Sequence, residues 1–240
     1  MWNLQIKRKD FVKPVFLEGL PGIGNVGKVV VDYIIEEFNA EKIGSIFSYN
    51  LPNTVFVNEN NLVELPKIEI YYKKINDQDF LFLSGDVQPN NEKACYDFCE
   101  RAISLLEKAG CAEIITLGGI GLGEIPKKPS VFCTGNDLNF IKEFVSIGAR
   151  DDIYGLVGPI IGVSGLLVGL SAGRIKAATL LCETYSHPMY LGLKEAKSIL
   201  QIIDSRYNLN ISFDKLNTEI SKNYDDEDVP KLKKDVNYIG

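Results

Sequence analysis

The sequence predicts an α/β protein, a three-layer αβα sandwich in which helices cover both faces of a mostly parallel sheet. Short apolar runs that suit buried strands alternate along the chain with stretches whose apolar residues recur at helical spacing. Two glycine-rich segments follow such strands. The content of charged and hydrophobic residues, 24% and 45%, is that of an ordinary globular protein. At 240 residues the chain has ample material for one core.

Strands are expected where an apolar run is short and bounded by turn residues. Residues 79–84 are dominated by a continuous apolar run, typical of a strand buried on both faces. Residues 67–73 alternate Ile68, Ile70 and Tyr72 with other side chains, as a half-buried strand does. The other expected strands cover residues 15–18, 43–49, 54–57, 113–117, 130–134 and 176–182. We expect residues 15–18, 80–84, 113–117 and 176–182 to lie in one sheet.

Helices are expected where apolar residues recur every three or four positions. The clearest covers residues 91–108, which Asn90 or Asn91 caps and Gly110 ends. A helix over residues 137–147 has its cap near Asn136. The other expected helices cover residues 25–38, 192–204 and 213–222.

An uncharged stretch over residues 153–173 allows two interpretations. It is long enough to cross a bilayer, and Gly165, Gly169 and Gly173 have the spacing with which membrane helices pack closely. It is also the only such stretch, and it lies in the middle of an α/β pattern. We therefore expect a buried helix whose glycines face a close neighbour, in the core or at a subunit interface. A membrane-associated protein is the alternative.

Composition and charge argue against several functions. The formal net charge is −6, and nucleic-acid binding needs clustered Lys and Arg, so we expect no nucleic-acid partner. The five cysteines lie in apolar contexts without a Cys-x-x-Cys pair, and His187 is the only histidine, so no metal site is expected. Reduced cysteines and the absence of a signal-like apolar run at the N-terminus favour the cytoplasm.

Residues 22–28, Gly-Ile-Gly-Asn-Val-Gly-Lys, form the sharpest local motif. The motif follows a strand and opens a helix, a place where backbone N–H groups bind anions. Read as a dinucleotide motif, it lacks the acidic residue that should end the next strand. Read as a P-loop, it has Val29 where magnesium binding needs Ser or Thr. We therefore favour a steric role for the glycines, and no cofactor is expected.

A second glycine-rich segment, residues 118–123, is expected to form a loop after the strand at 113–117. Loops that follow parallel strands converge on a crevice, and an enzyme or sensor would bind a nucleoside- or phosphate-like ligand there. The candidate lining residues are Gly22, Gly24, Asn25, Gly27, Gly119, Gly121 and Glu183. No Ser–His or Cys–His pair can be placed, so no catalytic residue is proposed. Acid–base work by Asp86, Glu124 and Glu183 stays open.

The last residues differ in composition from the rest of the chain. An acidic run and Pro230 precede several lysines, and the chain ends Tyr238-Ile239-Gly240. We expect residues 1–222 to form a single α/β domain and residues 223–240 to form a flexible C-terminal tail. A solvated tail gains nothing from an apolar tip unless something binds it. The alternative is a tip that docks on its own domain.

Residues 17–27, Leu-Glu-Gly-Leu-Pro-Gly-Ile-Gly-Asn-Val-Gly, resemble the opening signature of the proteasome assembly chaperone type 2 family, in its archaeal branch. The resemblance continues through residues 118–123 and through Gly-Pro-Ile-Ile-Gly-Val-Ser-Gly-Leu-Leu at 158–167. Glu183-Thr184, His187-Pro188 and the helix that contains Ala196 follow in the same order. Together these matches cover most of the chain.

This resemblance implies an αβα fold related to nucleoside phosphorylases, a homo-oligomer such as a tetramer, and no established catalysis. It also implies binding to the α-subunit ring of the 20S proteasome, in its assembly or activation. Relatives bind through a C-terminal hydrophobic-Tyr-any residue motif that enters pockets between α subunits. Tyr238 matches the tyrosine, Ile239 and Gly240 complete the tip, and Asn237 departs from the apolar position. The prediction is thus a non-enzymatic proteasome assembly chaperone or activator, with a ligand-binding enzyme or sensor as the alternative.

Overall fold

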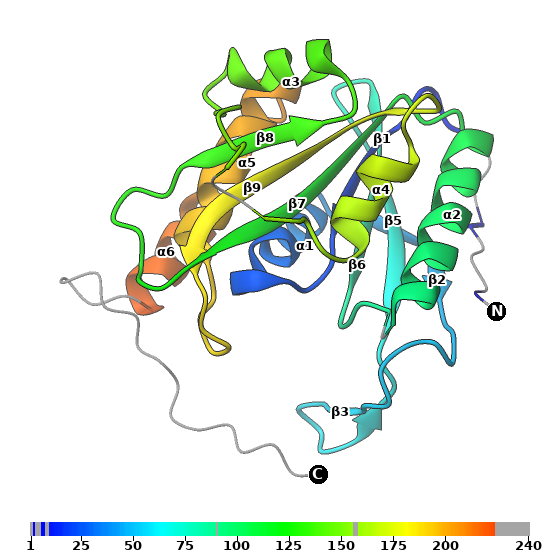
Figure 1. Cartoon of the computed structure of the whole chain (residues 1–240). Helices are drawn as coiled ribbons and strands as arrows, with labels where there is room; N and C mark the ends of the chain where they lie inside the picture. The colour runs from blue at the N-terminus through cyan, green and yellow to red at the C-terminus, as the bar shows by residue number, and fades with distance from the viewer. Residues whose placement is uncertain (1, 3–5, 8–9, 90, 156–157, 224–240) are drawn as a thin grey trace.

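A seven-stranded sheet forms the centre of the protein in a computed structural model that describes residues 2, 6–7, 10–89, 91–155 and 158–223 (Figure 1). The strands are arranged in the order β2-β5-β6-β1-β7-β9-β8. Their bounds are β1 Val15–Gly19, β2 Glu41–Ile46, β5 Ile68–Ile75, β6 Gln78–Gly85, β7 Glu113–Leu122, β8 Val131–Gly135 and β9 Lys176–Tyr185.

The sheet is mostly parallel. Strands β6, β1, β7 and β9 are parallel neighbours. Strand β5 is antiparallel to β6, and β2 is antiparallel to β5, so β2 points the same way as the four central strands. Only β5 and β8 point the opposite way. The prediction that residues 15–18, 80–84, 113–117 and 176–182 lie in one mostly parallel sheet is therefore confirmed.

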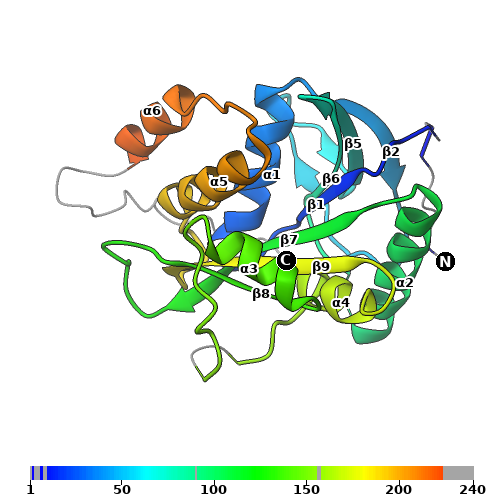
Figure 2. The same ribbon diagram turned by 90° about the horizontal axis from the view of Figure 1, so that it is seen from above.

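Helices cover both faces of the sheet, as the αβα prediction requires (Figure 2). The core on one face includes residues of α1 Val26–Glu37, α3 Leu138–Val145, α5 Leu193–Tyr207 and α6 Asp214–Asn223. The core on the other face includes residues of α2 Glu92–Lys108 and α4 Val163–Leu170. Because adjacent residues of a strand point to opposite faces, Leu17 packs in the first core and Phe16 in the second.

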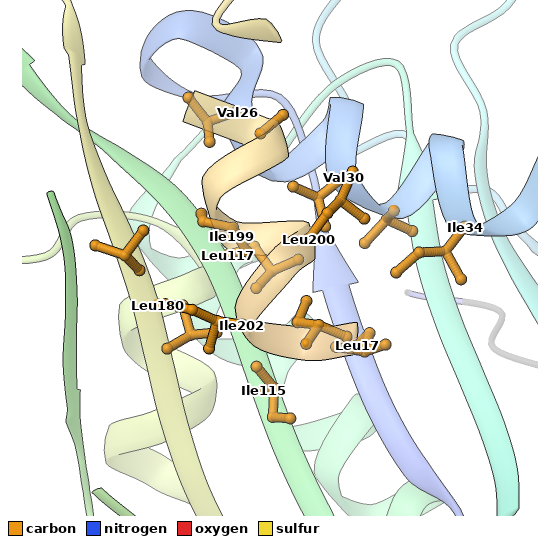
Figure 3. Packing of buried hydrophobic residues seen from close by; sticks show 14 of the residues in the cluster. Leu17, Val26, Val30, Ile34, Ile115, Leu117, Leu180, Ile199, Leu200 and Ile202 are labelled. Carbon is orange, nitrogen blue, oxygen red and sulfur yellow. The ribbon is translucent and has the colours of Figure 1, made fainter. Parts of the chain in front are cut away.

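The first core lies between α1, α5 and the central strands (Figure 3). Val30 and Ile34 lie one turn apart on α1, Leu117 of β7 packs in the same core, and Leu180 of the neighbouring β9 lies on the side of α5. All four side chains are fully or almost fully buried. This contact fixes the start of α1 against the end of β7, and the site described below depends on that junction.

Two local expectations hold with small differences. The strand expected at 54–57 is present as the shorter β3 Phe56–Val57, which pairs with β4 Val63–Glu64 in a hairpin separate from the main sheet. Helix α3 is capped by Asp137, whose carboxylate accepts a hydrogen bond from the Phe140 N–H, and not by Asn136. The Asn136 amide instead joins α4 to β9, donating to the carbonyl of Val168 and accepting from the N–H of Ala177.

The uncharged stretch at 153–173 is only partly helical. Helix α4 covers Val163–Leu170, and Gly162, with a φ of 93°, ends the loop before it. Among the described residues no helix is long and apolar enough to cross a membrane. A side chain at Gly165 would collide with the carbonyl of Ile160, but nothing described lies within 4 Å of one at Gly169 or Gly173. The prediction that the glycines pack closely within the chain is therefore wrong for Gly169 and Gly173. A role of these two glycines at a subunit interface remains a prediction.

Candidate functional site

The candidate site lies where the chain connectivity of the sheet reverses. Strands β1 and β7 are neighbours, but α1 after β1 packs on one face and leads toward β2 at one edge. Helix α2, which leads into β7, packs on the other face, and the chain after β7 continues toward β8 and β9. In open α/β sheets, such a switch point leaves a crevice beyond the carboxyl ends of the two strands, and ligands bind there.

A crevice of about 390 Å³ occupies this position. Its walls come from the turn after β1, the end of β7 and the loop before α4. The lining residues are Leu20, Gly22, Ile23, Gly27, Gln88, Leu117, Gly118, Gly119, Ile120, Gly121, Gly158, Pro159, Ile160, Ile161, Ser164 and Leu181. Gly22, Gly27, Gly119 and Gly121 from the sequence-based candidates are therefore brought together here.

The other three candidates lie outside the crevice. The backbone carbonyl of Gly24 accepts a hydrogen bond from the Gly192 N–H at 2.8 Å. Asn25 borders a separate hollow between α1 and α6. The carboxylate of Glu183 accepts a hydrogen bond from the Ser130 N–H at 2.9 Å and thereby holds the chain that enters β8. Asp86 and Glu124 are also absent from the lining, so the three acids do not converge on the crevice.

The second glycine-rich segment is a strand and not a loop. Residues 118–122 continue β7, and Gly118–Leu122 pair in parallel register with Leu181–Tyr185 of β9. Glycine is a weak strand former, and sequence reasoning ended the strand at 117 for that reason. The strand persists because β9 supplies its hydrogen bonds. Position 119 is a glycine because a side chain there would collide with the backbone carbonyl of Ile23.

The glycines of the 22–28 motif act through steric contact. A Cβ atom at Gly27 would lie closer than 3.0 Å to the carbonyl oxygen of Leu117, and one at Gly19 would be equally close to the carbonyl oxygen of Gly27. Helix α1 therefore sits directly on the ends of β1 and β7. Lys28 does not reach toward the crevice as a P-loop lysine would, because its ammonium pairs with Asp32 at 2.8 Å. The geometry supports the steric interpretation for Gly24 and Gly27, whereas nothing described lies within 4 Å of a side chain at Gly22.

Glu18 is a site residue that sequence reasoning did not single out. It belongs to the buried strand β1 and is fully buried beneath the crevice. One carboxylate oxygen accepts a hydrogen bond from the Leu20 N–H at 3.0 Å, and the other accepts from the Ser164 hydroxyl at 2.8 Å. Burial raises the pKa of Glu18 to about 7, although these hydrogen bonds oppose the shift. The available signal was a lone carboxylate inside the apolar run that precedes Gly19.

Gln88 makes a second polar link across the crevice. Its side-chain amide donates to the carbonyl of Pro21 at 2.7 Å and accepts from the N–H of Val163 at 3.1 Å. Together with the Glu18–Ser164 pair, it ties the turn after β1 to the start of α4. Part-buried hydrogen bonds from Glu18 and Gln88 thus hold the walls of the crevice together.

A second buried carboxylate, Glu195, lies in the first turn of α5. It accepts hydrogen bonds from the hydroxyls of Tyr190 at 2.8 Å and Thr184 at 3.3 Å. Burial raises the pKa of Glu195 as well. Thr184 also packs against Gly24, so the cluster of Glu195, Tyr190 and Thr184 supports the motif at 22–28. None of these three residues lines the crevice.

The described lining of the crevice is uncharged and mostly apolar. It contains no charged side chain, so a phosphate would find no counter-charge there. Ser164 faces a carboxylate, but both oxygens of Glu18 already accept hydrogen bonds, and this pair holds α4 against β1. His187 is engaged with the N–H of Met189, away from the crevice. Within the described residues no cluster of His, Cys, Asp or Glu could hold a metal ion.

The fold and the crevice define a doubly wound αβα protein with an uncharged site at the switch point. Comparison with known proteins then assigns the family. The chain belongs to the PAC2 family, whose sequence profile matches residues 16–225. The resemblance found in the motifs is therefore confirmed.

Relatives and solved structures of the same kind cover most of the chain. PbaB of Pyrococcus furiosus, an archaeal proteasome activator, is 28% identical over 92% of this chain and 95% of its own, with a TM-score of 0.83. PbaA of the same organism, an archaeal homologue of a proteasome-assembly chaperone, has a TM-score of 0.77 at 23% identity over 92% and 87%, which supports the fold. Protein MJ1210 of Methanocaldococcus jannaschii is 27% identical over 84% of this chain and 77% of its own.

Proposed function

We propose that this protein is a non-enzymatic proteasome assembly chaperone or activator that binds the α-subunit ring of the 20S proteasome. The observation that carries the proposal is the similarity to PbaB, which extends over nearly the whole length of both chains. Membership of the PAC2 family supports it. The partner we propose places the protein in the cytoplasm.

The chemistry of the site supports a binding role. Within the motif that resembles a nucleotide-binding loop, Gly27 packs on the backbone of Leu117 and Gly24 packs on the side chain of Thr184, and Lys28 is paired on the surface of α1. The buried carboxylates Glu18 and Glu195 accept hydrogen bonds that join elements of the fold. Both oxygens of Glu18 are used in this way, whereas both hydrogen bonds to Glu195 go to its Oε1 atom and its Oε2 atom has no partner among the described residues.

We further propose that contact with the α ring is made by the C-terminal tail, residues 223–240. Tyr238, Ile239 and Gly240 lie outside the described residues, so this part of the proposal depends on the sequence. The residues that follow Asn223 can span at most about 60 Å when fully extended, enough for a tip to reach well beyond the domain. A tyrosine suits the anchor role, because its ring fills an apolar slot and its hydroxyl can pair at the rim.

Several tails would act together in the homo-oligomer that we propose, of which a tetramer is one form. A single short peptide end binds weakly, because few atoms are buried and the tail must be ordered. Two or more tails on one oligomer raise the effective concentration and increase the avidity by orders of magnitude. A ring of α subunits offers repeated pockets that match such a set of tails.

Removal of the tail tip is expected to abolish binding. Deletion of residues 238–240, or Tyr238→Ala, removes the anchor from every tail, so the multivalent contact is lost altogether. The measurement is a pull-down with isolated proteasome α rings, accompanied by size-exclusion chromatography of each variant. The fold and the oligomeric state should be unchanged, because both described cores are built from residues that precede the tail.

Two tail variants serve as matched controls. Lys233→Ala lies in the tether and should bind as the wild type does. Asn237→Leu supplies the apolar residue that precedes the tyrosine in relatives, and it should tighten binding. Undiminished binding by the deletion would show that the globular surface makes the contact. Absence of binding by the wild type itself would contradict the proposed function.

One observation favours a second function, that of a small-ligand sensor. The crevice lies at the switch point where α/β proteins bind ligands, although its uncharged lining suits a neutral ligand such as a nucleoside better than a phosphate. We expect no magnesium-dependent binding of ATP, because Val29 offers no hydroxyl to the metal and Lys28 is paired with Asp32. Calorimetric titration with ATP and magnesium, and with adenosine alone, is the test. Tight magnesium-dependent binding would contradict this expectation.

A further inference from the structure

The connection between β2 and β5 carries an unusual set of exposed apolar side chains. We call residues 47–65, which contain the hairpin of β3 and β4, the arm. Figure 1 shows the hairpin projecting away from the helices and the main sheet. The exposed large apolar residues of the arm are Phe47, Tyr49, Val55, Phe56, Val57, Leu62, Val63 and Leu65. Half of all such exposed residues among the described part of the chain thus fall within this one segment.

Leu51 at the base of the arm packs in the second core, but the hairpin beyond it has a defined conformation and no core of its own. Asn58 holds the turn, since its side chain accepts hydrogen bonds from the N–H groups of Asn60 and Leu62 and donates to Glu64. Val57 and Val63 form a cross-strand pair, yet they are 67% and 68% exposed. No residue of 52–65 belongs to either buried core. An isolated two-stranded hairpin is marginal in water, so this one lacks the packing that would stabilise it.

The crevice offers a concave surface of matching chemistry. Its described lining carries no charge. Two of the lining residues, Ile23 and Ile161, are 46% and 83% exposed. The arm and the crevice also lie at the same edge of the sheet. Strand β2 points the same way as β1 and β7, so the arm leaves the sheet at the edge where those two strands end. The arm does not line the crevice of its own chain.

We propose that the arm of one copy packs into the crevice of a second copy of this chain. The hairpin exposes apolar side chains, the crevice lining is uncharged, and one contact between copies would cover both surfaces. Monomeric proteins rarely expose apolar patches larger than a few hundred Å². The arm gathers eight large exposed apolar side chains in one segment, and such a patch is typical of a protein–protein interface. Because the two surfaces share an edge, two copies that face each other can exchange arms reciprocally, as a closed dimer requires.

This inference does not depend on proteasome binding, and its test measures self-association. The arm variant is Val57→Lys with Val63→Glu, which removes the apolar pair but leaves opposite charges across the hairpin, so the turn is retained. The crevice variant is Ile161→Asp. The control is Leu138→Asp, an exposed apolar residue in the first turn of α3, where an acidic side chain is tolerated.

Light scattering after size-exclusion chromatography gives the result. The wild type and the control should associate, whereas the arm and crevice variants should each dissociate, with an affinity roughly a hundredfold lower. An equimolar mixture of the two variants should form a mixed dimer, because the intact arm of one meets the intact crevice of the other. A monomeric wild type, persistent association of either variant, or failure of the mixture to associate would overturn the proposal.

A cross-linking measurement covers the case in which a charged variant does not fold. Chains with Val57→Cys mixed with chains with Ile161→Cys should form a disulfide-linked dimer under mild oxidation. Chains with Leu138→Cys in place of Val57→Cys should not. Four of the five native cysteines are buried, and Cys111 is half-buried, so the background is low. Equal cross-linking with the Leu138→Cys chains would overturn the proposal.

Discussion

Gly27→Ala is expected to lower the free energy of unfolding by about 3 kcal/mol. The added Cβ would lie within 3.0 Å of the carbonyl oxygen of Leu117, which is held in the sheet by its pairing with Leu180. A backbone atom in a paired strand cannot rotate away as a side chain can. Alanine gains about 1 kcal/mol over glycine in a helix, but this gain cannot offset the displacement of α1 from β7. Gly19 of β1 also packs closely against the backbone of Gly27, and the same displacement of α1 would strain this contact.

Gly22→Ala is the matched control, because it adds the same atom to the same motif. Gly22 has nothing within 4 Å of its Cβ position, and its φ of −154° is open to alanine. Chemical denaturation of the wild type and both variants at equal protein concentration makes the comparison. If Gly27→Ala and Gly22→Ala prove equally stable, the motif is not a packing motif, and a ligand-binding role for its glycines gains weight.

Glu18 is expected to make the stability of the protein depend on pH. Burial raises its pKa to about 7 in the folded state from 4.5. Between these two values the folded protein holds a proton that the unfolded chain releases. The contribution of Glu18 is therefore fully present below pH 4.5, falls by about 3 kcal/mol as the pH rises to 7, and is constant above that. Glu195, whose pKa is also raised by burial, acts in the same direction.

The variant Glu18→Gln separates the contribution of Glu18 to the pH dependence of stability from that of Glu195. The amide keeps the shape of the side chain, still accepts the Leu20 N–H and cannot ionise. The difference in unfolding free energy between the variant and the wild type should therefore shift by about 3 kcal/mol in favour of the variant between pH 4.5 and 8. Glu124→Gln, at an exposed position, should show no such shift. Parallel curves for the wild type and Glu18→Gln would mean that the Glu18 carboxylate is as well solvated as in the unfolded chain.

The candidate site was predictable only in part. The motif at 22–28 could be placed at a strand-to-helix junction, and the absence of Ser or Thr at Val29 argued correctly for a steric role. The steric role itself depends on Leu117, ninety positions away, which no local pattern connects to Gly27. Glu183 was placed at the crevice because it follows an apolar strand. Glu183 instead belongs to a longer β9, which pairs in parallel with β7, and its carboxylate accepts a hydrogen bond from the Ser130 N–H.

The sequence by itself determined the elements whose signals are local. Helical spacing and the Asn91 cap defined α2, continuous apolar runs defined β1 and β6, and a chain of motifs identified the family. The tertiary structure decided what depends on distant partners. Gly118–Leu122 is a strand because β9 supplies its hydrogen bonds, and Glu18 remains in the core because Ser164 and Leu20 meet its carboxylate there. Local propensity is worth less than 1 kcal/mol per residue, so pairing and burial with segments far along the chain override it.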